Sequence, residues 1–333
     1  MAHPERSVLL LDLSIQGDAS VITLGGTAEP EGFAPGVRTR GAEKIAALDA
    51  GHTAAGFLTA VCAYTAAPAP SGFSFLRGAG SAPAKPFDWP AHCVSVKEVH
   101  PASNVPPNLF LAAGGRALYK LFSDAVVLSC AASLRAAFAS MPANTIVLID
   151  TDAELSERMA SLLGIAAAQE LCLVLTSSWT DYGRVLDDAA NGLFAGMSWL
   201  STNDPGFKAK VSAVVFNNVT KRLAAASDLC GSPSALSFTP PAPAKESITE
   251  ILQHLFVMCT DSASNYRAYF SDAAAFADVA SFTRRYVTGL ATVPDSVWQS
   301  CLAQGVPVVL ASPSDPQKAS ATQLCDVAKR LFG

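Results

Sequence analysis

Three polar residues that could do chemistry each follow a short run of apolar residues. Asp12 and Asp150 close two of these runs, and Asn217 follows the third. Runs of this length that end at turn signals are typical of strands buried on both faces of a parallel sheet. Ligands of such sheets bind outside the carboxyl ends of the strands. We therefore predict that the three side chains gather along one edge of a parallel sheet.

The two acids have a functional and a structural interpretation. A hydrophobic strand that closes on Asp has the form of a Walker B strand, whose carboxylate holds Mg²⁺ through water beside nucleotide phosphates. A strand-end Asp also caps the helix that follows it in many proteins. Asn217 is likewise either a ligand-contacting amide or an ordinary turn residue. The residues alone leave both interpretations open.

The rest of the chain alternates between predicted strands and predicted helices, which indicates βαβ units and a parallel sheet. The handedness of such units places the helices on both faces of the sheet. We predict one doubly wound, mostly parallel α/β domain over residues 1–333, with Pro/Ala-rich loop insertions at 66–90 and 232–244. The predicted strands are 8–13, 94–99, 108–113, 145–149, 171–175, 211–216, 289–293 and 306–310. The predicted helices are 41–64, 124–141, 154–168, 180–195, 247–258, 265–286, 296–304 and 316–332.

The composition limits the class of protein. Hydrophobic residues make up 50% of the 333 residues and charged residues 15%, which favours a well-buried globular core. The net charge is −5, so no overall basic field would recruit nucleic acid. The eight cysteines include no C-x-x-C pair, and the five histidines have no H-E-x-x-H spacing. We interpret the cysteines as buried free thiols and expect no metal site built from imidazole or thiolate groups.

The sequence also indicates in which cellular compartment the protein acts. The first residues, MAHPERSV, contain no apolar region after a basic start, so we expect no secretory signal. No apolar run reaches the ~18 residues that a membrane-spanning helix needs. Free thiols suit a reducing compartment. We therefore expect a cytoplasmic protein without a membrane span.

Taken in order, several segments resemble the ParA/MinD family of deviant P-loop ATPases. VLLLDLSIQGDAS is similar to that family's VLLIDLDPQGNAT segment, PNLFLAAGG to the strand and turn before its next helix, and TIVLIDTDAEL to its Walker B segment. KVSAVVFNNVTKR resembles the strand whose Asn contacts adenine. LATVPDSVWQSCLAQGVPVVLASPSDPQKASATQLCDVAKRLF resembles the C-terminal block. The resemblance covers most of the chain apart from the two loops and implies a P-loop NTPase-like fold.

The resemblance also implies a site for ATP and Mg²⁺. It makes Asp150 the Walker B carboxylate and Asp12 the first acid of the D-x-D-x-Q segment, which lies near the magnesium and its water. Gln16 matches the Gln of that segment, Asn217 the adenine-contacting Asn, and Pro294 the Pro of the loop that borders the base. Family members dimerise face to face around ATP and position DNA, protein complexes or division machinery. A homodimer or a protein partner is therefore expected, while the weak basic character gives DNA less support.

This chain departs from the family pattern at the elements that bind and hydrolyse ATP. No K-G-G-x-G-K-[ST] loop is present, since Gly25-Gly26 precedes TAEP and Gly114-Gly115 precedes RALYK. Ser14 replaces the second acid of D-x-D, and a hydroxyl cannot act as a carboxylate base at neutral pH. We therefore predict that this chain does not hydrolyse ATP and binds it weakly or not at all.

Two explanations of the missing loop stay open. In the first, which we favour, the sequence lacks its true N-terminus, because only seven residues precede Val8 and the family's phosphate-loop strand lies inside the sheet. Deleting that strand would expose unpaired backbone on its two neighbours. In the second, the chain is a non-catalytic scaffold or protein-binding module that has kept only the fold, as Ser14 suggests. A third hypothesis, a Rossmann-type enzyme, requires a G-x-G-x-x-G motif that this sequence lacks.

Overall fold

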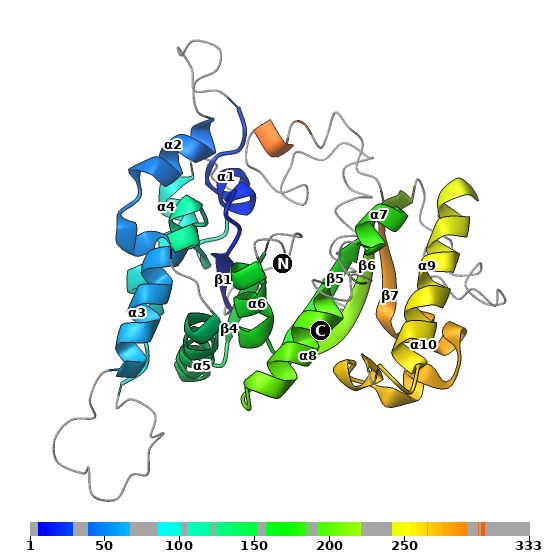
Figure 1. The fold of residues 1–333 in the computed structure, drawn as a ribbon. Helices are drawn as coiled ribbons and strands as arrows, with labels where there is room; N and C mark the ends of the chain where they lie inside the picture. The colour runs from blue at the N-terminus through cyan, green and yellow to red at the C-terminus, as the bar shows by residue number, and fades with distance from the viewer. Residues whose placement is uncertain are drawn as a thin grey trace, which may run out of the picture. The chain divides into compact units, whose positions relative to one another are not determined.

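The structure is a computed structural model that describes most of the chain. The described residues are 6–28, 39–66, 85–100, 105–120, 124–151, 158–183, 186, 192–220, 242–264, 266–291, 299 and 301–303. The chain divides into two compact units (Figure 1). Unit 1 is Met1–Ala167 with Gln299–Leu310, and unit 2 is Ala168–Trp298 with Ala311–Gly333. Because the chain divides into two units, a single domain over residues 1–333 stays a prediction.

Unit 1 is built on a four-stranded, mostly parallel sheet. The strands lie in the order β2-β3-β1-β4, in which β1 pairs in parallel with β3 and β4, and β2 is antiparallel to β3. The strands are β1 (Ser7–Asp12), β2 (Val94–Ser95), β3 (Leu109–Ala112) and β4 (Thr145–Asp150). The helices are α1 (Asp18–Leu24), α2 (Arg40–Ala47), α3 (Ala54–Ala66), α4 (Val96–Val99), α5 (Asp124–Ser140) and α6 (Arg158–Ala167). The 3₁₀ helices are η1 (Ala50–His52), η2 (Trp89–His92) and η3 (Arg116–Lys120).

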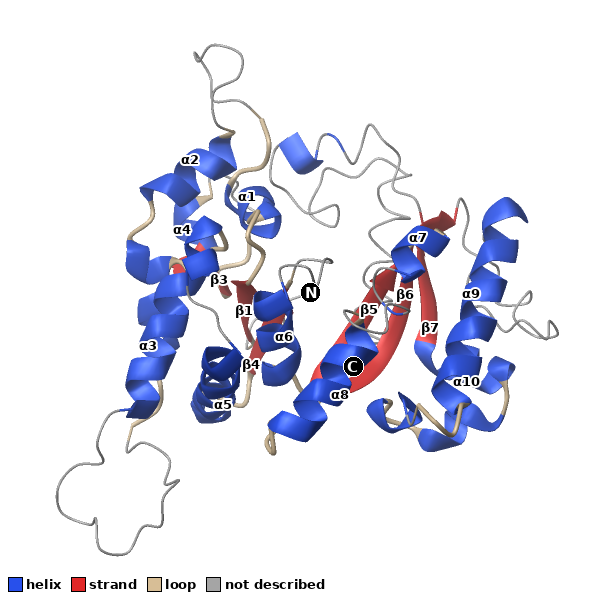
Figure 2. Cartoon of the chain, viewed as in Figure 1, coloured by secondary structure: helices blue, strands red, loops and turns tan. Residues whose placement is uncertain are grey.

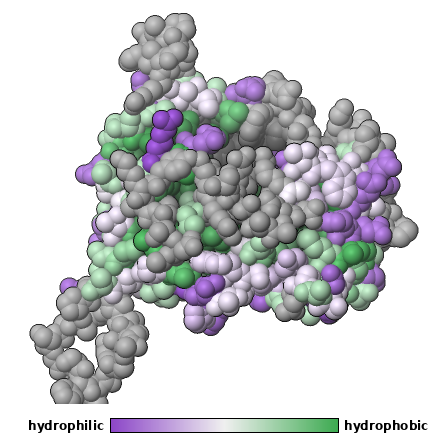
Figure 3. All heavy atoms as spheres, viewed as in Figure 1, coloured by the Kyte–Doolittle hydropathy of each residue, from purple (hydrophilic) through white to green (hydrophobic). Residues whose placement is uncertain are grey.

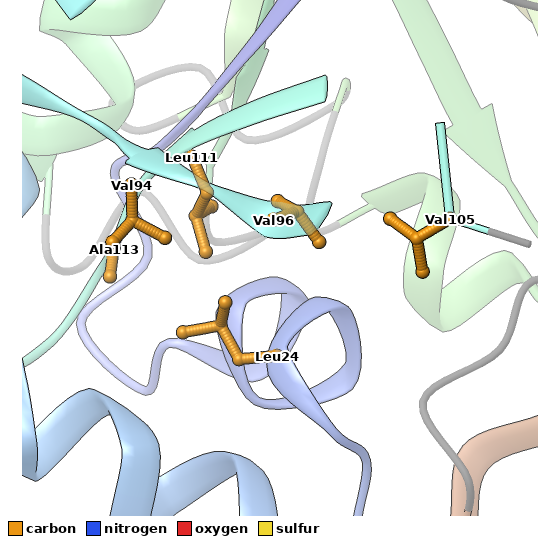
Figure 4. Close-up of a cluster of buried hydrophobic side chains, with 6 residues drawn as sticks. All are labelled: Leu24, Val94, Val96, Val105, Leu111 and Ala113. Carbon is orange, nitrogen blue, oxygen red and sulfur yellow. The ribbon is translucent and has the colours of Figure 1, made fainter. Parts of the chain in front are cut away.

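β1, one of the two inner strands of the unit 1 sheet, carries more buried residues than the other inner strand, β3. Leu9 and Leu11 of β1 are fully buried, as expected of an apolar strand with a neighbour on each edge. α1 contributes Leu24, which points toward Val94 and Leu111 of β2 and β3 in a hydrophobic cluster (Figure 4). This cluster holds α1 against the sheet and so fixes the segment that connects β1 to α1.

Unit 2 contains a three-stranded parallel sheet in the order β5-β6-β7 (Figure 2). The strands are β5 (Glu170–Leu175), β6 (Lys210–Thr220) and β7 (Val287–Ala291). The helices are α7 (Trp179–Tyr182), α8 (Leu193–Asn203), α9 (Ala242–Thr260) and α10 (Val279–Tyr286), with the 3₁₀ helices η7 (Tyr266–Tyr269) and η8 (Ala273–Ala277). Each unit thus has a mainly parallel sheet with helices around it, in agreement with the predicted α/β class.

An aromatic cluster fills the core of unit 2 beside α9 and α10. The Phe270 ring packs edge-on against Phe276, Phe282 and Tyr286, with ring centroids 5.0 to 5.6 Å apart. Aromatic rings prefer such edge-to-face contacts because the positive ring edge meets the negative face. The exposed residues near the start of α9 are hydrophilic by contrast and include Glu246 and Glu250 (Figure 3).

Two predicted helices are broken where aspartates begin new turns. The predicted helix 41–64 divides into α2 and α3, because the Asp49 carboxyl accepts the Gly51 N–H and starts η1. The predicted helix 265–286 divides into η7, η8 and α10. Asp272 and Asp278 accept the N–H groups of Ala274 and Ser281, as helix-capping residues do. The predicted helix 180–195 is described only in part: α7 ends at Tyr182, Gly183 and Leu186 are π-helical, and α8 begins at Leu193.

The predicted strand 94–99 is mostly helical. Only Val94 and Ser95 are in β2, and α4 begins at Val96, where the His100 N–H donates to the Val96 carbonyl. The apolar residues of this segment suit one face of a helical turn as well as a strand.

The segment predicted as a surface loop at 66–90 is buried near its end, because Phe87 and Trp89 are each only 5% exposed.

Several predicted elements lie wholly or partly outside the described residues. They include the strand 306–310, the helix 316–332, most of the helix 296–304 and residues 67–84 and 232–241 of the two loops. The end of the predicted loop 232–244 is wrong, because residues 242–244 are the start of α9, and other predicted elements hold with small shifts at their ends. The strand predicted at 211–216 continues to Thr220 in β6, and the one predicted at 289–293 is β7.

Candidate functional site

The two strand-end acids of unit 1 lie side by side. In the parallel pairing of β1 with β4, Asp12 is the register partner of Asp150. The main-chain N–H of Leu13 donates to the Asp150 carbonyl at 2.8 Å, so the pairing continues one residue past the strand. The carboxyl ends of these neighbouring strands therefore place two acids at one edge of the sheet, as the sequence predicts for this pair.

The Asp12 carboxyl group is fully buried and accepts hydrogen bonds from the segment that follows it. Its Oδ1 accepts the Ser14 N–H at 2.9 Å. Its Oδ2 accepts the Ser20 N–H at 2.9 Å and the Ser20 hydroxyl at 2.5 Å. Because Ser20 is in the first turn of α1, Asp12 satisfies a helix N-terminal N–H group that the chain would otherwise leave without an intrahelical partner. The helix-capping interpretation of Asp12 therefore describes its observed contacts.

Ser14 and two glycine turns complete this network. The Ser14 hydroxyl accepts the Gly17 N–H at 2.9 Å, and the Ser14 carbonyl accepts the Gly115 N–H at 3.1 Å. The Ser20 hydroxyl accepts the Gly114 N–H at 2.9 Å. Gly17 has φ of 70°, a left-handed conformation that glycine adopts without strain. The segment after β1 and the turn after β3 are thus bonded to each other.

Close packing explains why glycine occupies this second turn. A Cβ atom on Gly114 would lie 2.6 Å from the Asp12 carboxyl carbon and 2.7 Å from the Ser14 carbonyl oxygen. Real Cβ atoms do not approach other heavy atoms so closely. The main chain at Gly114 therefore rests directly against the buried carboxyl group.

The described residues do not make a cradle for nucleotide phosphates on their own. A phosphate loop offers main-chain N–H groups to its ligand, but the N–H groups of Gly17, Gly114 and Gly115 donate to Ser14 and Ser20. The Gly26 N–H donates to the Val21 carbonyl. Within the described ranges, no group of three or more His, Cys, Asp or Glu residues could hold a metal ion. These residues therefore do not fit Mg²⁺-ATP by themselves.

The remaining predicted site residues lie in different elements and differ in how exposed they are. Gln16 is exposed in the segment between β1 and α1, and Asp150 is half-buried at the end of β4. In unit 2, Asn217 is exposed on β6, where the pairing with β7 shifts between Phe216 and Thr220. Pro294 lies outside the described residues. The structure brings Asp12 and Asp150 together in unit 1, whereas Asn217 lies in unit 2.

Sequence reasoning missed Ser20 and Gly114. Both are central to the network around Asp12, since the Ser20 hydroxyl donates to the carboxyl group and accepts from Gly114. Ser20 follows Asp12 by eight residues, and Gly114 follows Ser20 by 94. The Gly-Gly pair was visible in the sequence, but its contact with the first strand was not.

Comparisons with known proteins bear on the fold. No family model matches the sequence, and no curated protein matches it. The structure of pNOB8 ParA aligns with a TM-score of 0.50 and 11% identity, covering 98% of this chain and 88% of that one. The chain has a ParA-like fold.

Two structures of McdA from Cyanothece also match the ParA-like chain. The apo form has a TM-score of 0.48 at 12% identity, covering 96% of this chain and 88% of that one. The ATP complex of a McdA variant has a TM-score of 0.47 at 11% identity, covering 97% and 85%.

In the part of this ParA-like chain that the structure describes, no helix combines the length and the apolar character that crossing a bilayer requires.

Proposed function

We propose that this chain is a ParA-like homologue of the nucleotide-switch proteins that position DNA or protein complexes, and that the 333-residue chain does not itself hydrolyse ATP. The observation that carries the first part is the register of β1 with β4 in a ParA-like fold. It pairs Asp12 with Asp150 at the carboxyl ends of adjacent parallel strands, which is where such sheets bind ligands.

The lack of hydrolysis is supported by what surrounds Ser14. The resemblance implies an acid at this position, but the residue is a buried serine whose hydroxyl accepts the Gly17 N–H. A hydroxyl with this role cannot replace a carboxylate as the base that orients water. The glycine N–H groups nearby are also used inside the protein, so a phosphate would have to break existing hydrogen bonds.

The roles of individual residues stay predictions. The resemblance implies that Asp150 would hold Mg²⁺ through water and that Gln16, Asn217 and Pro294 would each contact the nucleotide. Asp12 lies next to Asp150 and shapes the segment that carries Gln16. The chain would act in the cytoplasm as a homodimer or with a protein partner, and DNA is the less supported cargo.

A scaffold or protein-binding module is the second candidate. It is favoured by the closed network of Asp12, Ser14, Ser20 and the glycine turns, which is complete without a ligand. A scaffold would keep the ParA-like fold and bind no nucleotide. The two candidates therefore differ in a measurable property, the affinity for ATP.

We expect the purified 333-residue chain to release no phosphate from ATP in the presence of Mg²⁺. The measurement is a phosphate-release assay, accompanied by calorimetric titration with ATP. Binding without turnover would support the nucleotide-switch homologue, and no binding would support the scaffold. Mg²⁺-dependent turnover that is lost in Asp150→Ala but kept in Glu98→Ala, an exposed acid on α4, would contradict the proposed lack of hydrolysis.

A further inference from the structure

Two cysteines of unit 1 face each other across a helix–helix contact. Cys62 lies on α3 and Cys130 on α5, and their Sγ atoms are 3.6 Å apart. One helical turn further along both helices, the hydroxyl oxygens of Thr65 and Ser133 are 2.8 Å apart. Both pairs span 68 residues in the sequence, so the two contacts fix the same register between the helices.

We propose that Cys62 and Cys130 form a redox modification site, at which a small disulfide such as oxidised glutathione converts the two thiols to an intramolecular disulfide. A disulfide has a sulfur–sulfur distance of about 2.05 Å, so the thiols must approach by roughly 1.5 Å. Rotation about the Cα–Cβ bonds moves sulfur atoms by such distances. The contact between the hydroxyl groups of Thr65 and Ser133 keeps the helices in place while the bond forms.

The two thiols differ in their access to an oxidant. Cys62 is half-buried, whereas Cys130 is only 3% exposed. Burial and the neighbouring Cys62 thiol raise the pKa of Cys130, which therefore stays protonated at neutral pH. Cys62 is thus the cysteine that meets a small disulfide from solvent, and Cys130 is the resolving thiol.

The reaction balances with two equivalents of glutathione released. The Cys62 thiolate attacks one sulfur of oxidised glutathione, the disulfide bond breaks, and one glutathione leaves as a thiolate that takes a proton from water. The Cys130 thiol then loses its proton and attacks Cys62 Sγ, which releases the second glutathione. The two cysteines are oxidised by two electrons, and the glutathione disulfide is reduced to two thiols.

Other described cysteines differ from this pair. Cys93 and Cys259 are buried, which raises the pKa of each thiol to about 12 and shields it from a disulfide in solvent. Cys172 is exposed on β5 of unit 2. Cys62 and Cys130 are the described cysteines whose thiols are recorded in contact with each other. Oxidation should therefore select this pair.

The disulfide would tie α3 to α5 and reach the candidate site through the start of α3. The Ala54 N–H of α3 donates to the Ala113 carbonyl at 2.7 Å, and Ala113 precedes the Gly114–Gly115 turn. Closing a 68-residue loop also restricts the unfolded chain and stabilises the folded one. We expect the midpoint of thermal unfolding to rise by about 5 °C on oxidation.

The test is peptide mapping of the full chain without reduction, after incubation with oxidised glutathione and alkylation of the remaining thiols. The expected result is a Cys62–Cys130 cross-link in the wild-type protein. It should be absent in Cys62→Ser, and Cys130→Ser should instead carry a single glutathione on Cys62. Cys172→Ser is the matched control and should keep the cross-link.

Two outcomes would overturn the proposal. One is a wild-type protein that accumulates glutathione on Cys62 without forming the cross-link. The other is a set of links in which Cys62 pairs with several cysteines at similar yields, because that pattern reports unfolding. The wild-type map decides between these results even if the serine variants fail to fold, and the thermal midpoint with and without reductant gives a second readout.

Discussion

Replacing Asp12 with alanine should lower the free energy of unfolding by about 3–4 kcal/mol. The substitution removes a buried carboxyl group that accepts the Ser14 N–H, the Ser20 N–H and the Ser20 hydroxyl. It leaves these buried donors without their acceptor, and a buried unsatisfied polar group costs about 1–3 kcal/mol. Urea denaturation followed by circular dichroism measures the loss.

The matched control for this prediction is Asp18→Ala. Asp18 is in the same connecting segment and in the first turn of α1, but it is exposed. Its interaction with the helix N-terminus is worth at most about 1 kcal/mol. Equal losses in the two variants would show that the Asp12 carboxyl group is not the organising contact of this segment.

Gly114→Ala should lower the free energy of unfolding by about 3 kcal/mol or prevent folding. The added Cβ would lie 2.6 Å from the Asp12 carboxyl carbon and 2.7 Å from the Ser14 carbonyl oxygen. Neither atom is the end of a flexible side chain, so main chain and buried carboxyl group must both move. The same denaturation experiment measures this effect.

Two further variants make the Gly114 prediction specific. Gly183→Ala is the control, because a Cβ there meets no heavy atom within 4 Å and the residue is already in the right-handed helical region. This control should gain up to about 1 kcal/mol or stay unchanged. The double variant Asp12→Ala/Gly114→Ala should lose less than the sum of the single losses, since removing the carboxyl group opens space for the methyl group. Strict additivity would contradict the close contact.

The pairing of Asp12 with Asp150 could be predicted from the sequence because it depends on local patterns. Two apolar runs that each close on an acid identify parallel strands, and parallel strands bring their carboxyl ends to one edge. The ParA-like fold was predicted from the resemblance of several segments, taken in order, to the ParA/MinD family.

The hydrogen-bond partners of Asp12 could not be predicted, because an Asp that holds a metal and an Asp that caps a helix look alike in a sequence. What distinguishes them is Ser20, eight residues away, and Gly114, which contacts Ser20 from a distance of 94 residues. The contact of Cys62 with Cys130 is long-range in the same sense.

Local competition explains the errors in secondary structure. Asp272 and Asp278 interrupt an apolar periodic stretch that otherwise favours one helix, because each starts a new turn by accepting a main-chain N–H group. Capping geometry of this kind depends on which donor is nearest, and the hydrophobic pattern does not contain that information.

Hydrogen exchange measured by mass spectrometry, with and without Mg²⁺-ATP, tests the central claim most directly. The claim is that the N–H groups of Gly17, Ser20, Gly114 and Gly115, in the segment after β1 and the turn after β3, are used inside the protein and not offered to phosphate. We predict that the amides of Gly17, Ser20, Gly114 and Gly115 exchange slowly without nucleotide and that millimolar Mg²⁺-ATP leaves their rates unchanged. Fast exchange at these amides without nucleotide, slowed by Mg²⁺-ATP, would contradict the claim and identify a working phosphate site.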